Sequence, residues 1–386
     1  MITFDCKVNR KNTSSIKYDF HARYGKPEDA MPLWIADMDF QIPKEVSAVL
    51  QKAVDHAIYG YTESTEAYFK SLHNWYAQRY NYHTQEEWLI KTPGVTFALG
   101  MAIKAFTAPG ENILIQTPLY PPIATTIKLN RRNVVDNTLV YNNGGYEIDF
   151  ADFEEKITST NVKMFILCSP HNPVGRVWTK EELQEMGRIC KKHNVLVVSD
   201  EIHCDIVFPG HKHLVFSTVC EDVPSIICTA PSKTFNIAGL QVSNIFIPDA
   251  NLRDMFMNEV LATGYHQLST MGLAAGQAAY EHGHIWHKQL MDYLYENAAY
   301  VKNFVAANLR QVKVADLQGT YLMWLDFNEF NMPHDKLEDI MANRSKLWPS
   351  SGAAFGEAGA GFFRFNIACP KSTLEEAMDR LLKFIK

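Results

Sequence analysis

Five short apolar runs, separated in several places by helical stretches, constrain the fold of this chain most strongly. One of the helical stretches, 180–193, follows Thr179 and has Glu182 at the spacing of a capping box. Strands that alternate with helices predict a mainly parallel sheet that helices cover on both faces. Ligands of such sheets gather at the carboxyl ends of the strands. The five expected strands are 112–116, 163–168, 195–199, 225–229 and 243–247.

The composition is that of an ordinary globular protein, with 47% hydrophobic and 21% charged residues. A net charge of −6 without a long basic run argues against nucleic acid as a partner. No window approaches a membrane span, and the first residues lack the apolar core of a signal peptide. The seven cysteines are an odd number and lie far apart, as expected of reduced thiols. We therefore expect a cytoplasmic protein without a membrane partner.

Lys233 follows the expected strand 225–229 and precedes a loop that contains Gly239. A lysine at such a strand end is expected to point into a cleft, where loss of hydration favours the uncharged amine. An uncharged amine attacks carbonyl carbons, and enzymes use this reaction in Schiff bases with pyridoxal phosphate. One lysine alone fits a surface position better, so the hypothesis depends on three further segments.

Those segments put suitable groups at the ends of other strands. Asp200 ends an apolar run and would keep a pyridine nitrogen protonated, although by itself it also fits a helix N-cap. Asn172 lies between Pro170 and Pro173, which fix the backbone, and its amide can donate to a phenolic oxygen. The run Thr-Pro-Gly-Val-Thr, which ends at Thr96 before an apolar helix, offers free backbone amides to a phosphate.

The motifs Gly-Val-Thr, Pro-His-Asn-Pro-Val-Gly, Ser-Asp-Glu-Ile-His, Ser-Lys and Arg-Phe-Asn follow one another over nearly the whole chain. In this order they resemble the fold-type I pyridoxal-phosphate enzymes, the large family of aspartate aminotransferase. Within that family, the segments 34–40, 200–203 and 232–236 look most like the cystathionine β-lyase branch known as the MalY/PatB group. The resemblance implies an α/β fold whose large domain holds a mainly parallel seven-stranded sheet between helices.

At 386 residues the chain exceeds what one hydrophobic core usually supports, so two domains are expected. Helical periodicity over 289–309 gives way to a different pattern, and we expect a boundary near residue 280. The resemblance implies a small α+β domain made from the two chain ends, 1–44 and 281–386, beside a large cofactor-binding domain at 45–280.

The resemblance also implies a role for each site residue. Lys233, Asp200 and Tyr120 would be catalytic: Lys233 would form the Schiff base, Asp200 would pair with the ring nitrogen, and Tyr120 would stack on the ring. Arg364 would hold the substrate carboxylate as a bidentate fork, and Ala36 would be a further substrate contact. The other implied cofactor contacts are Asn172 and His203 near the ring oxygen, and Val95, Thr96, Ser232 and, from the partner subunit of a homodimer, Tyr61 at the phosphate.

Two positions depart from the aminotransferase pattern. Gln241 stands where many aminotransferases have an arginine eight residues after the lysine, and Ala230 stands where they have a phosphate-binding serine. The phosphate site is therefore expected to be less cationic and to depend more on backbone amides, which fits the lyase branch.

Two groups of histidines could suggest a metal, but neither has a nearby cysteine pair or a closed set of four ligands. We therefore expect no metal site. The two groups are His203, His211 and His213, and His282, His284 and His287.

The leading hypothesis is a carbon–sulfur β-lyase that cleaves L-cystathionine or related cysteine conjugates to a thiol, pyruvate and ammonia. An aminotransferase of the same fold is the first alternative, because every residue named above serves both reactions. A regulatory protein that uses this scaffold to contact a transcription factor is the second. Lys233, Asp200 and Arg364 argue against a purely non-catalytic role, although a regulatory partner stays open as a second role.

Overall fold

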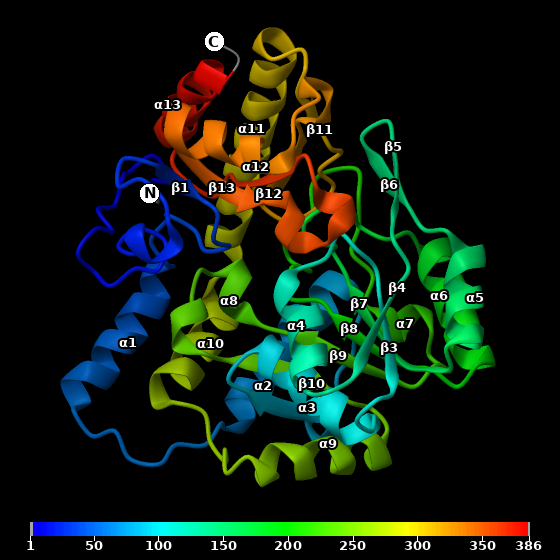
Figure 1. Cartoon of the computed structure of the whole chain (residues 1–386). Helices are drawn as coiled ribbons and strands as arrows, with labels where there is room; N and C mark the ends of the chain where they lie inside the picture. The colour runs from blue at the N-terminus through cyan, green and yellow to red at the C-terminus, as the bar shows by residue number, and fades with distance from the viewer. Residues whose placement is uncertain (1–2, 385–386) are drawn as a thin grey trace.

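The computed structural model describes residues 3–384, and within them a seven-stranded sheet forms the centre of the larger layer (Figure 1). Its strand order is β2-β10-β9-β8-β7-β3-β4. β10 runs antiparallel to both of its neighbours, and the other neighbouring pairs are parallel, as predicted. The strands are β2 (Leu89–Thr92), β3 (Asn112–Ile115), β4 (Asn133–Asp136), β7 (Val162–Cys168), β8 (Leu196–Asp200), β9 (Ser225–Thr229) and β10 (Ser243–Phe246).

Both faces of this sheet are buried, because apolar residues point alternately to two separate cores. In β7, Met164 and Ile166 belong to one core, whereas Phe165 and Leu167 belong to the other. The first core is closed by α3 (Val95–Phe106), α4 (Pro121–Leu129) and α9 (Ala250–Ala262). The second is closed by α2 (Glu66–Tyr80), α5 (Phe150–Ser159), α6 (Lys180–Lys192) and α10 (Thr270–His282).

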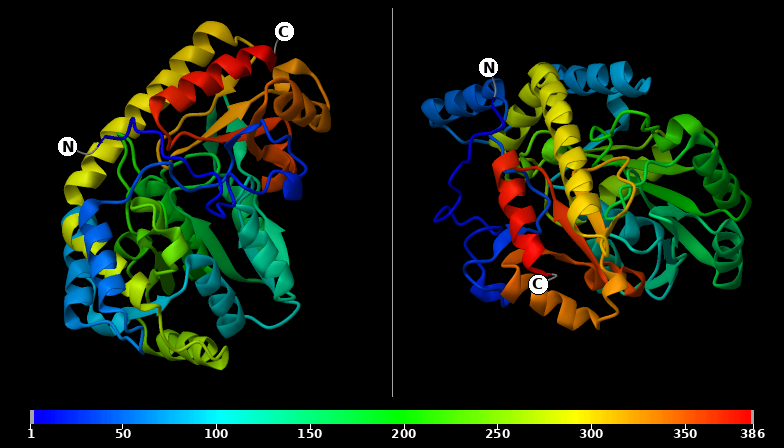
Figure 2. Two further views of the ribbon diagram at one scale, coloured as in Figure 1. Left: turned by 90° about the vertical axis from the view of Figure 1, so that its left-hand side faces the viewer. Right: turned by 90° about the horizontal axis from the view of Figure 1, so that it is seen from above.

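A second sheet joins the two ends of the chain, with the strand order β1-β13-β14-β12-β11. β1 pairs in parallel with β13, so the N-terminal segment completes a sheet of C-terminal strands. α11 and α13 contact each other along this layer (Figure 2). The domain boundaries expected at 44 and 280 stay predictions. The elements are β1 (Met31–Leu33), α11 (His284–Asn308), β11 (Lys313–Val314), β12 (Leu322–Asp326), α12 (His334–Asp339), β13 (Leu347–Ser351), β14 (Phe362–Asn366) and α13 (Lys371–Leu381).

Three further α-helices and one hairpin complete the α-helices and strands of the described residues, and short 3-10 and π-helical turns lie between them. None of the helices within residues 3–384 has the length and apolar character needed to cross a membrane. The remaining elements are α1 (Lys44–His56), α7 (Phe216–Val219), α8 (Pro231–Thr234), and the hairpin of β5 (Val140–Asn142) and β6 (Gly145–Glu147).

The expected elements agree closely with the observed ones. The expected strand 225–229 coincides with β9, and the other four differ from the observed strands by one residue at one or both ends. The capping box of α6 is present, with Thr179 and Glu182 each bonded to the other's backbone amide. The helix expected at 289–309 begins earlier, at His284, because the buried Trp286 and His287 extend its packed face.

Candidate active site

Besides Ala36, eight of the predicted site residues line one cavity of about 410 Å³ at the carboxyl ends of the parallel strands. The segments that follow β2, β3, β7, β8 and β9 reach this cavity at the same edge of the sheet. These eight residues are Val95, Thr96, Tyr120, Asn172, Asp200, His203, Ser232 and Lys233, and Ala36 from the N-terminal segment also lines the cavity.

Lys233 lies in α8, directly after β9, with a partly buried side chain. Its Nζ donates a 2.7 Å hydrogen bond to the carbonyl oxygen of Ala36, and Tyr321 Oη donates to the same oxygen at 3.0 Å. Burial lowers the pKa of Lys233 to about 8. The amine is therefore much easier to deprotonate than a surface lysine, as the sequence predicts. Tyr321 carries no sequence signal and was not predicted.

Asp200 ends β8, with only 5% of its surface exposed. Burial, with a smaller effect of the neighbouring Glu201, raises the pKa of Asp200 to about 7, and the hydrogen bond from the backbone N–H of Ile202 to Oδ1 limits the rise. Burial lowers the pKa of His203 to about 3, so this imidazole is neutral. His203 Nδ1 is buried and has no hydrogen-bond partner among the described residues. Among the described residues, the Asp200 carboxyl thus makes no ion pair within 4.0 Å, and His203 Nδ1 makes no hydrogen bond.

Arg364 lies in the middle of β14, a fully buried strand in which its neighbours Phe363 and Phe365 are aromatic. Its Nη1 donates to Asn172 Oδ1 at 2.8 Å, and its Nη2 donates to the carbonyl oxygen of Trp34 at 2.7 Å and to Ser350 Oγ at 3.1 Å. Burial lowers the pKa of Arg364 to about 10, so the guanidinium stays charged at neutral pH. Because Asn172 Oδ1 accepts from Arg364, Asn172 Nδ2 is the group left to donate into the cavity.

The N-terminus of α3 lies at one end of the cavity and presents backbone N–H groups there, which suit an anion. The first turn of this helix leaves backbone N–H groups free, because its N-cap residue, Gly94, has no side chain that could accept from them. The hydroxyl-bearing residues Thr96 and Ser232 line the same cavity, and so does Gln241. Among the described residues that line this cavity, Lys233 is the one with a cationic side chain.

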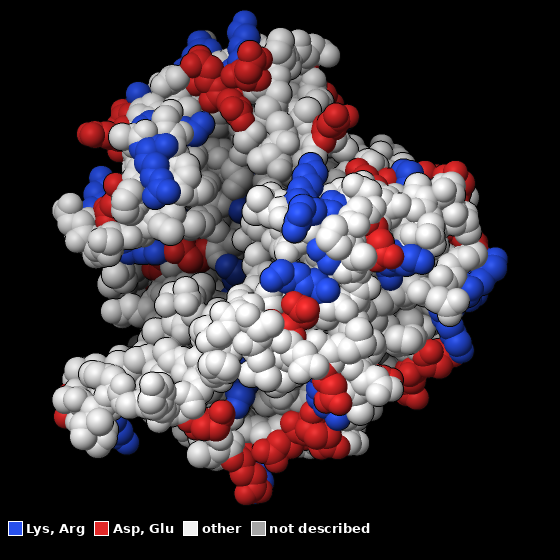
Figure 3. Space-filling model, turned by 60° about the horizontal axis from the view of Figure 1, so that its bottom comes forward, with Lys and Arg blue, Asp and Glu red and all other residues white. Residues whose placement is uncertain are grey.

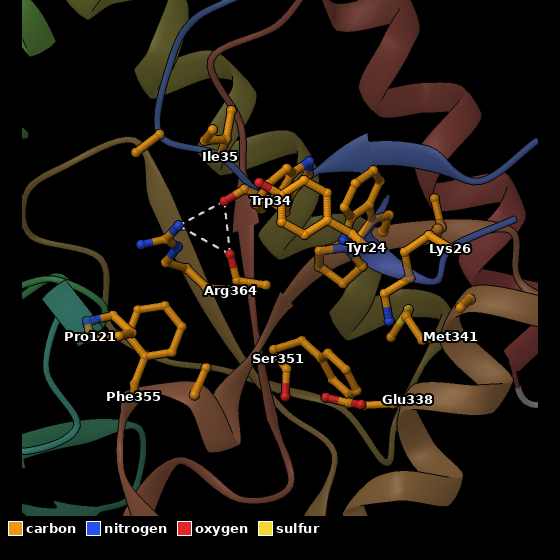
Figure 4. A pocket seen from close by; sticks show the side chains of 18 of the residues that line it. Tyr24, Lys26, Trp34, Ile35, Pro121, Glu338, Met341, Ser351, Phe355 and Arg364 are labelled. Atoms are coloured by element: carbon orange, nitrogen blue, oxygen red, sulfur yellow. Dashed lines mark hydrogen bonds between the residues drawn. The ribbon is translucent and has the colours of Figure 1, made fainter. Parts of the chain in front are cut away.

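A second cavity, of about 470 Å³, opens from the first at Ala36, Tyr120 and Lys233, which line both. Arg364 lies on one side of it (Figure 4). The indole rings of Trp34 and Trp348 also line it and stack with centroids 4.6 Å apart and planes 12° apart. The space-filling view shows a deep hollow with basic side chains inside it (Figure 3). Lys233 thus lies where the two cavities meet.

Two asparagines hold the segment that carries Ala36. Asn366 Nδ2 donates to the carbonyl oxygens of Ile35 and Asp37, at 2.6 Å each. Asn236 accepts from the backbone N–H of Met38 at 2.9 Å and donates to its carbonyl oxygen at 3.0 Å. These hydrogen bonds fix the backbone on both sides of Ala36, and the sequence did not predict them.

Tyr61 is the one predicted site residue that lines neither cavity among those the structure describes. Its side chain is 99% exposed and lies beside the loop that precedes α10, near Gly264 and Ser269. Within a single chain it takes no part in the site.

Neither histidine group approaches a metal-binding arrangement. Across residues 3–384 no group of three or more His, Cys, Asp or Glu side chains is placed to hold a metal ion. His213 instead pairs with Glu201 at 2.9 Å, and His287 Nε2 lies 2.7 Å from the carbonyl oxygen of Asp205.

Comparison with known proteins agrees with this geometry. The family described as aminotransferase class I and II matches residues 28–381. Cystathionine β-lyase PatB of Bacillus subtilis is 37% identical over 98% of this chain and 99% of its own. The structure of cystalysin from Treponema denticola, which contains pyridoxal 5′-phosphate, has a TM-score of 0.96 at 37% identity, covering 100% of this chain and 99% of its own. A pyridoxal-phosphate-bound C–S lyase of Staphylococcus hominis has a TM-score of 0.92 at 29% identity, covering 99% and 97%. The chain belongs to the aminotransferase class I and II family.

Proposed function

We propose that this chain is a pyridoxal-phosphate-dependent carbon–sulfur β-lyase that acts on L-cystathionine or related cysteine conjugates. The observation that carries the proposal is the position of Lys233, at the junction of an anion-binding cavity and an arginine-bearing cavity. The relatives named cystathionine β-lyase and C–S lyase, which align with nearly the whole chain, support the reaction type.

The residues of the first cavity fit pyridoxal phosphate. The free amides of α3, with Val95, Thr96 and Ser232, would hold its phosphate. Within residues 3–384 Asp200 makes no ion pair within 4.0 Å, and it would gain a cationic partner in the protonated ring nitrogen, which removes the cost of burying its charge. The free amide of Asn172 and the neutral His203 would contact the ring oxygen, and Tyr120 would stack on the ring. Lys233 would form the covalent link to the cofactor.

When bound, pyridoxal phosphate supplies an electron sink for the electron pair that a departing Cα proton leaves behind. Arg364 binds the substrate carboxylate and so fixes the orientation of the Cα–H bond. Lys233 Nζ takes the Cα proton, because its lowered pKa makes it an effective base near neutral pH. Asp200 keeps its negative charge beside the ring nitrogen throughout.

The bond from Cβ to sulfur then breaks, and the electron pair leaves with the thiolate. The second cavity extends from Lys233 and would receive this leaving group. The three-carbon fragment that remains takes up one water molecule and gives pyruvate and ammonia. The site residues return to their starting state, so no keto acid is consumed.

An aminotransferase is the second candidate. The family description includes this activity, and the geometry of the site is compatible with it. The same residues would bind substrate and move the Cα proton, but Lys233 would return that proton to the cofactor instead of assisting departure of a thiolate. We rank it below the lyase because Gln241 and Ala230 depart from the aminotransferase pattern. A regulatory role would add to catalysis rather than replace it.

We further propose a cytoplasmic homodimer in which Tyr61 reaches the phosphate site of the partner subunit. The exposed Tyr61 is accompanied by other exposed apolar side chains on the same segment, Ile58 at 68% and Tyr59 at 58%. An exposed apolar segment of this kind is typical of an interface.

Product analysis tests the proposed function. Protein loaded with pyridoxal phosphate is expected to convert L-cystathionine to homocysteine, pyruvate and ammonia in equal amounts. Lys233→Ala is expected to abolish all three products together with the borohydride-reducible link to the cofactor. Lys302→Ala, which changes an exposed lysine of α11, is the control and is expected to keep full activity. Formation of a keto acid of unchanged carbon skeleton, without a thiol, would exclude the lyase.

A further inference from the structure

The second cavity has charged side chains on two opposite sides. Arg364 occupies one side, and Lys26 and Glu338 occupy the side farthest from it (Figure 4). The wall between them is largely apolar and is formed by Tyr24, Trp34, Met341, Leu347, Trp348, Phe355 and Phe363. The proposed reaction requires Arg364 and Lys233, but it gives no role to Lys26 or Glu338.

Glu338 is held in place as an anion. Its Oε1 lies 3.3 Å from His334 Nε2, and that same nitrogen lies 2.7 Å from Ser351 Oγ. His334 Nδ1 accepts the backbone N–H of Gly361 at 2.9 Å, so the neutral ring carries its proton on Nε2 and donates toward Glu338 and Ser351. Hydrogen bonding by His334 and Ser351, with a smaller effect of the Lys26 charge, lowers the pKa of Glu338 to about 2. A carboxylate therefore faces the cavity at neutral pH, with Oε2 left for a ligand.

Lys26 supplies a positive charge to the same side of the cavity. It lies just after Gly25, whose φ of 62° turns the chain there. Its side chain extends toward the wall that Met341 and Glu338 form (Figure 4). Within residues 3–384 its amine makes no ion pair within 4.0 Å and no hydrogen bond, so Lys26 and Glu338 face one space without neutralising each other by direct contact.

We propose that Glu338 and Lys26 form a subsite for the far end of the leaving group and select conjugates whose thiol carries an amino-acid end. Glu338 binds the ammonium group of that end, and Lys26 binds its carboxylate. The apolar wall contacts the methylene groups between the sulfur and this end. The inference rests on the proposed function, since it names the leaving group of the same reaction.

The opposed signs of the two charges identify a dipolar ligand. A simple alkyl or aryl thiol would fit the apolar wall but would leave Glu338 and Lys26 without a partner, and it would remove water from both. A singly charged end would satisfy one of them and face repulsion from the other. A group that bears both an ammonium and a carboxylate, as the homocysteine half of L-cystathionine does, satisfies both.

The test compares two substrates in the parent protein and in two variants, Glu338→Gln and Lys26→Met. The measured quantities are kcat and KM. One substrate is L-cystathionine, which has the dipolar end, and the other is S-propyl-L-cysteine, which has an uncharged end of similar length. Glu338→Gln and Lys26→Met are each expected to lower kcat/KM for L-cystathionine by about tenfold or more, mainly through KM, because each removes one charged hydrogen bond. For S-propyl-L-cysteine the same variants are expected to match the parent within about twofold, which also shows that they are folded.

The controls are Glu357→Gln and Lys336→Met, which change exposed residues near the same layer that line neither cavity. Both are expected to match the parent on both substrates. An equal effect of Glu338→Gln on both substrates, or no effect on either, would overturn the subsite. If the parent cleaves neither substrate, the proposed function fails as well; if it cleaves both and the variants do not discriminate, only the subsite fails.

Discussion

Burial of Asp200 disfavours the charged form of its side chain. With 5% of its surface exposed and no cation in direct contact among the described residues, it has a pKa of about 7 instead of its ordinary 3.8. This cost is expected of a residue that serves a bound ligand rather than the stability of the protein. The cofactor-free protein should therefore be destabilised at neutral pH by a residue that the loaded enzyme requires.

This cost gives the stability of the cofactor-free protein a defined pH dependence. The folded pKa of Asp200 is raised, so the penalty is absent below about pH 4 and grows as pH rises to about 7, because only the unfolded chain ionises freely there. The full difference amounts to about 4 kcal/mol. Asp200→Asn removes the ionisation and is expected to be more stable than the parent at pH 8 by a large part of this amount, but not at pH 4.

Urea unfolding of both cofactor-free proteins at pH 4, 6 and 8 measures the effect. Asp254→Asn, which changes an exposed acid of α9, is the control and is expected to follow the parent at every pH. If the free energies of unfolding of the parent and of Asp200→Asn changed in parallel with pH, ionisation of Asp200 would not destabilise the folded protein.

At the scale of single elements, short strands determine where the chemistry lies. β8 and β9 are parallel neighbours, so Asp200 at the end of one and Lys233 after the end of the other reach the same cavity. Asp200 is the last residue of β8 and Lys233 lies in the short helix α8, so the packed strands and the helices that cover them fix the positions of both groups. Helix stability therefore contributes to the site indirectly.

The start of α6 allows the contribution of one helix end to the stability of the protein to be measured separately from catalysis. Thr179→Ala removes the side-chain acceptor of the capping box and is expected to lower the free energy of unfolding by about 1 kcal/mol, with kcat/KM unchanged. Thr158→Ala is the control, because Thr158 is an exposed residue within α5 and its hydroxyl bonds only to carbonyls of its own helix. Denaturant midpoints of the two variants should differ; equal midpoints would mean that the capping box adds nothing.

The sequence predicts what is local and misses what only tertiary packing brings together. Lys233 and Asp200 each follow an apolar run that identifies a strand, so their position at a strand end can be inferred. Tyr321 and Ser350 reach Ala36 and Arg364 only when the strands of the second sheet, which come from both ends of the chain, assemble. No periodicity or motif marks them. The parallel pairing of β1 with β13 joins segments more than 300 residues apart and was not predicted; the family resemblance implied only that the two chain ends form one small domain.

At the scale of the whole molecule, the site is assembled between two layers. Lys233 and Asp200 come from the seven-stranded sheet, and Arg364 comes from the sheet of the chain ends (Figure 1). The hydrogen bond from Arg364 to Asn172 joins the layers inside the site. Tyr61 would add a third source, the partner subunit, because its exposed position keeps it outside both cavities of its own chain.

Subunit mixing tests whether Tyr61 acts across the interface. Tyr61→Ala and Lys233→Ala are each expected to be nearly inactive. Exchange of subunits between the two variants creates mixed dimers in which one site has Lys233 from one chain and Tyr61 from the other. Random exchange should then restore about a quarter of the parental activity per dimer. In the control, Tyr59→Ala is used in place of Tyr61→Ala. It tests whether loss of any exposed aromatic side chain of this segment lowers activity. Absence of recovery after demonstrated exchange would contradict the shared site.

The central claim is that electrons leave with a thiolate instead of staying on the cofactor, and the number of turnovers per site measures it most directly. Protein loaded with pyridoxal phosphate is mixed with an excess of L-cystathionine in the absence of any keto acid, and pyruvate is counted against active sites. A β-lyase restores its starting state in each cycle, so pyruvate is expected to accumulate linearly far beyond one equivalent, with equal homocysteine and ammonia. A stop after one equivalent of keto acid, relieved by adding a second keto acid, would contradict the account and identify an aminotransferase.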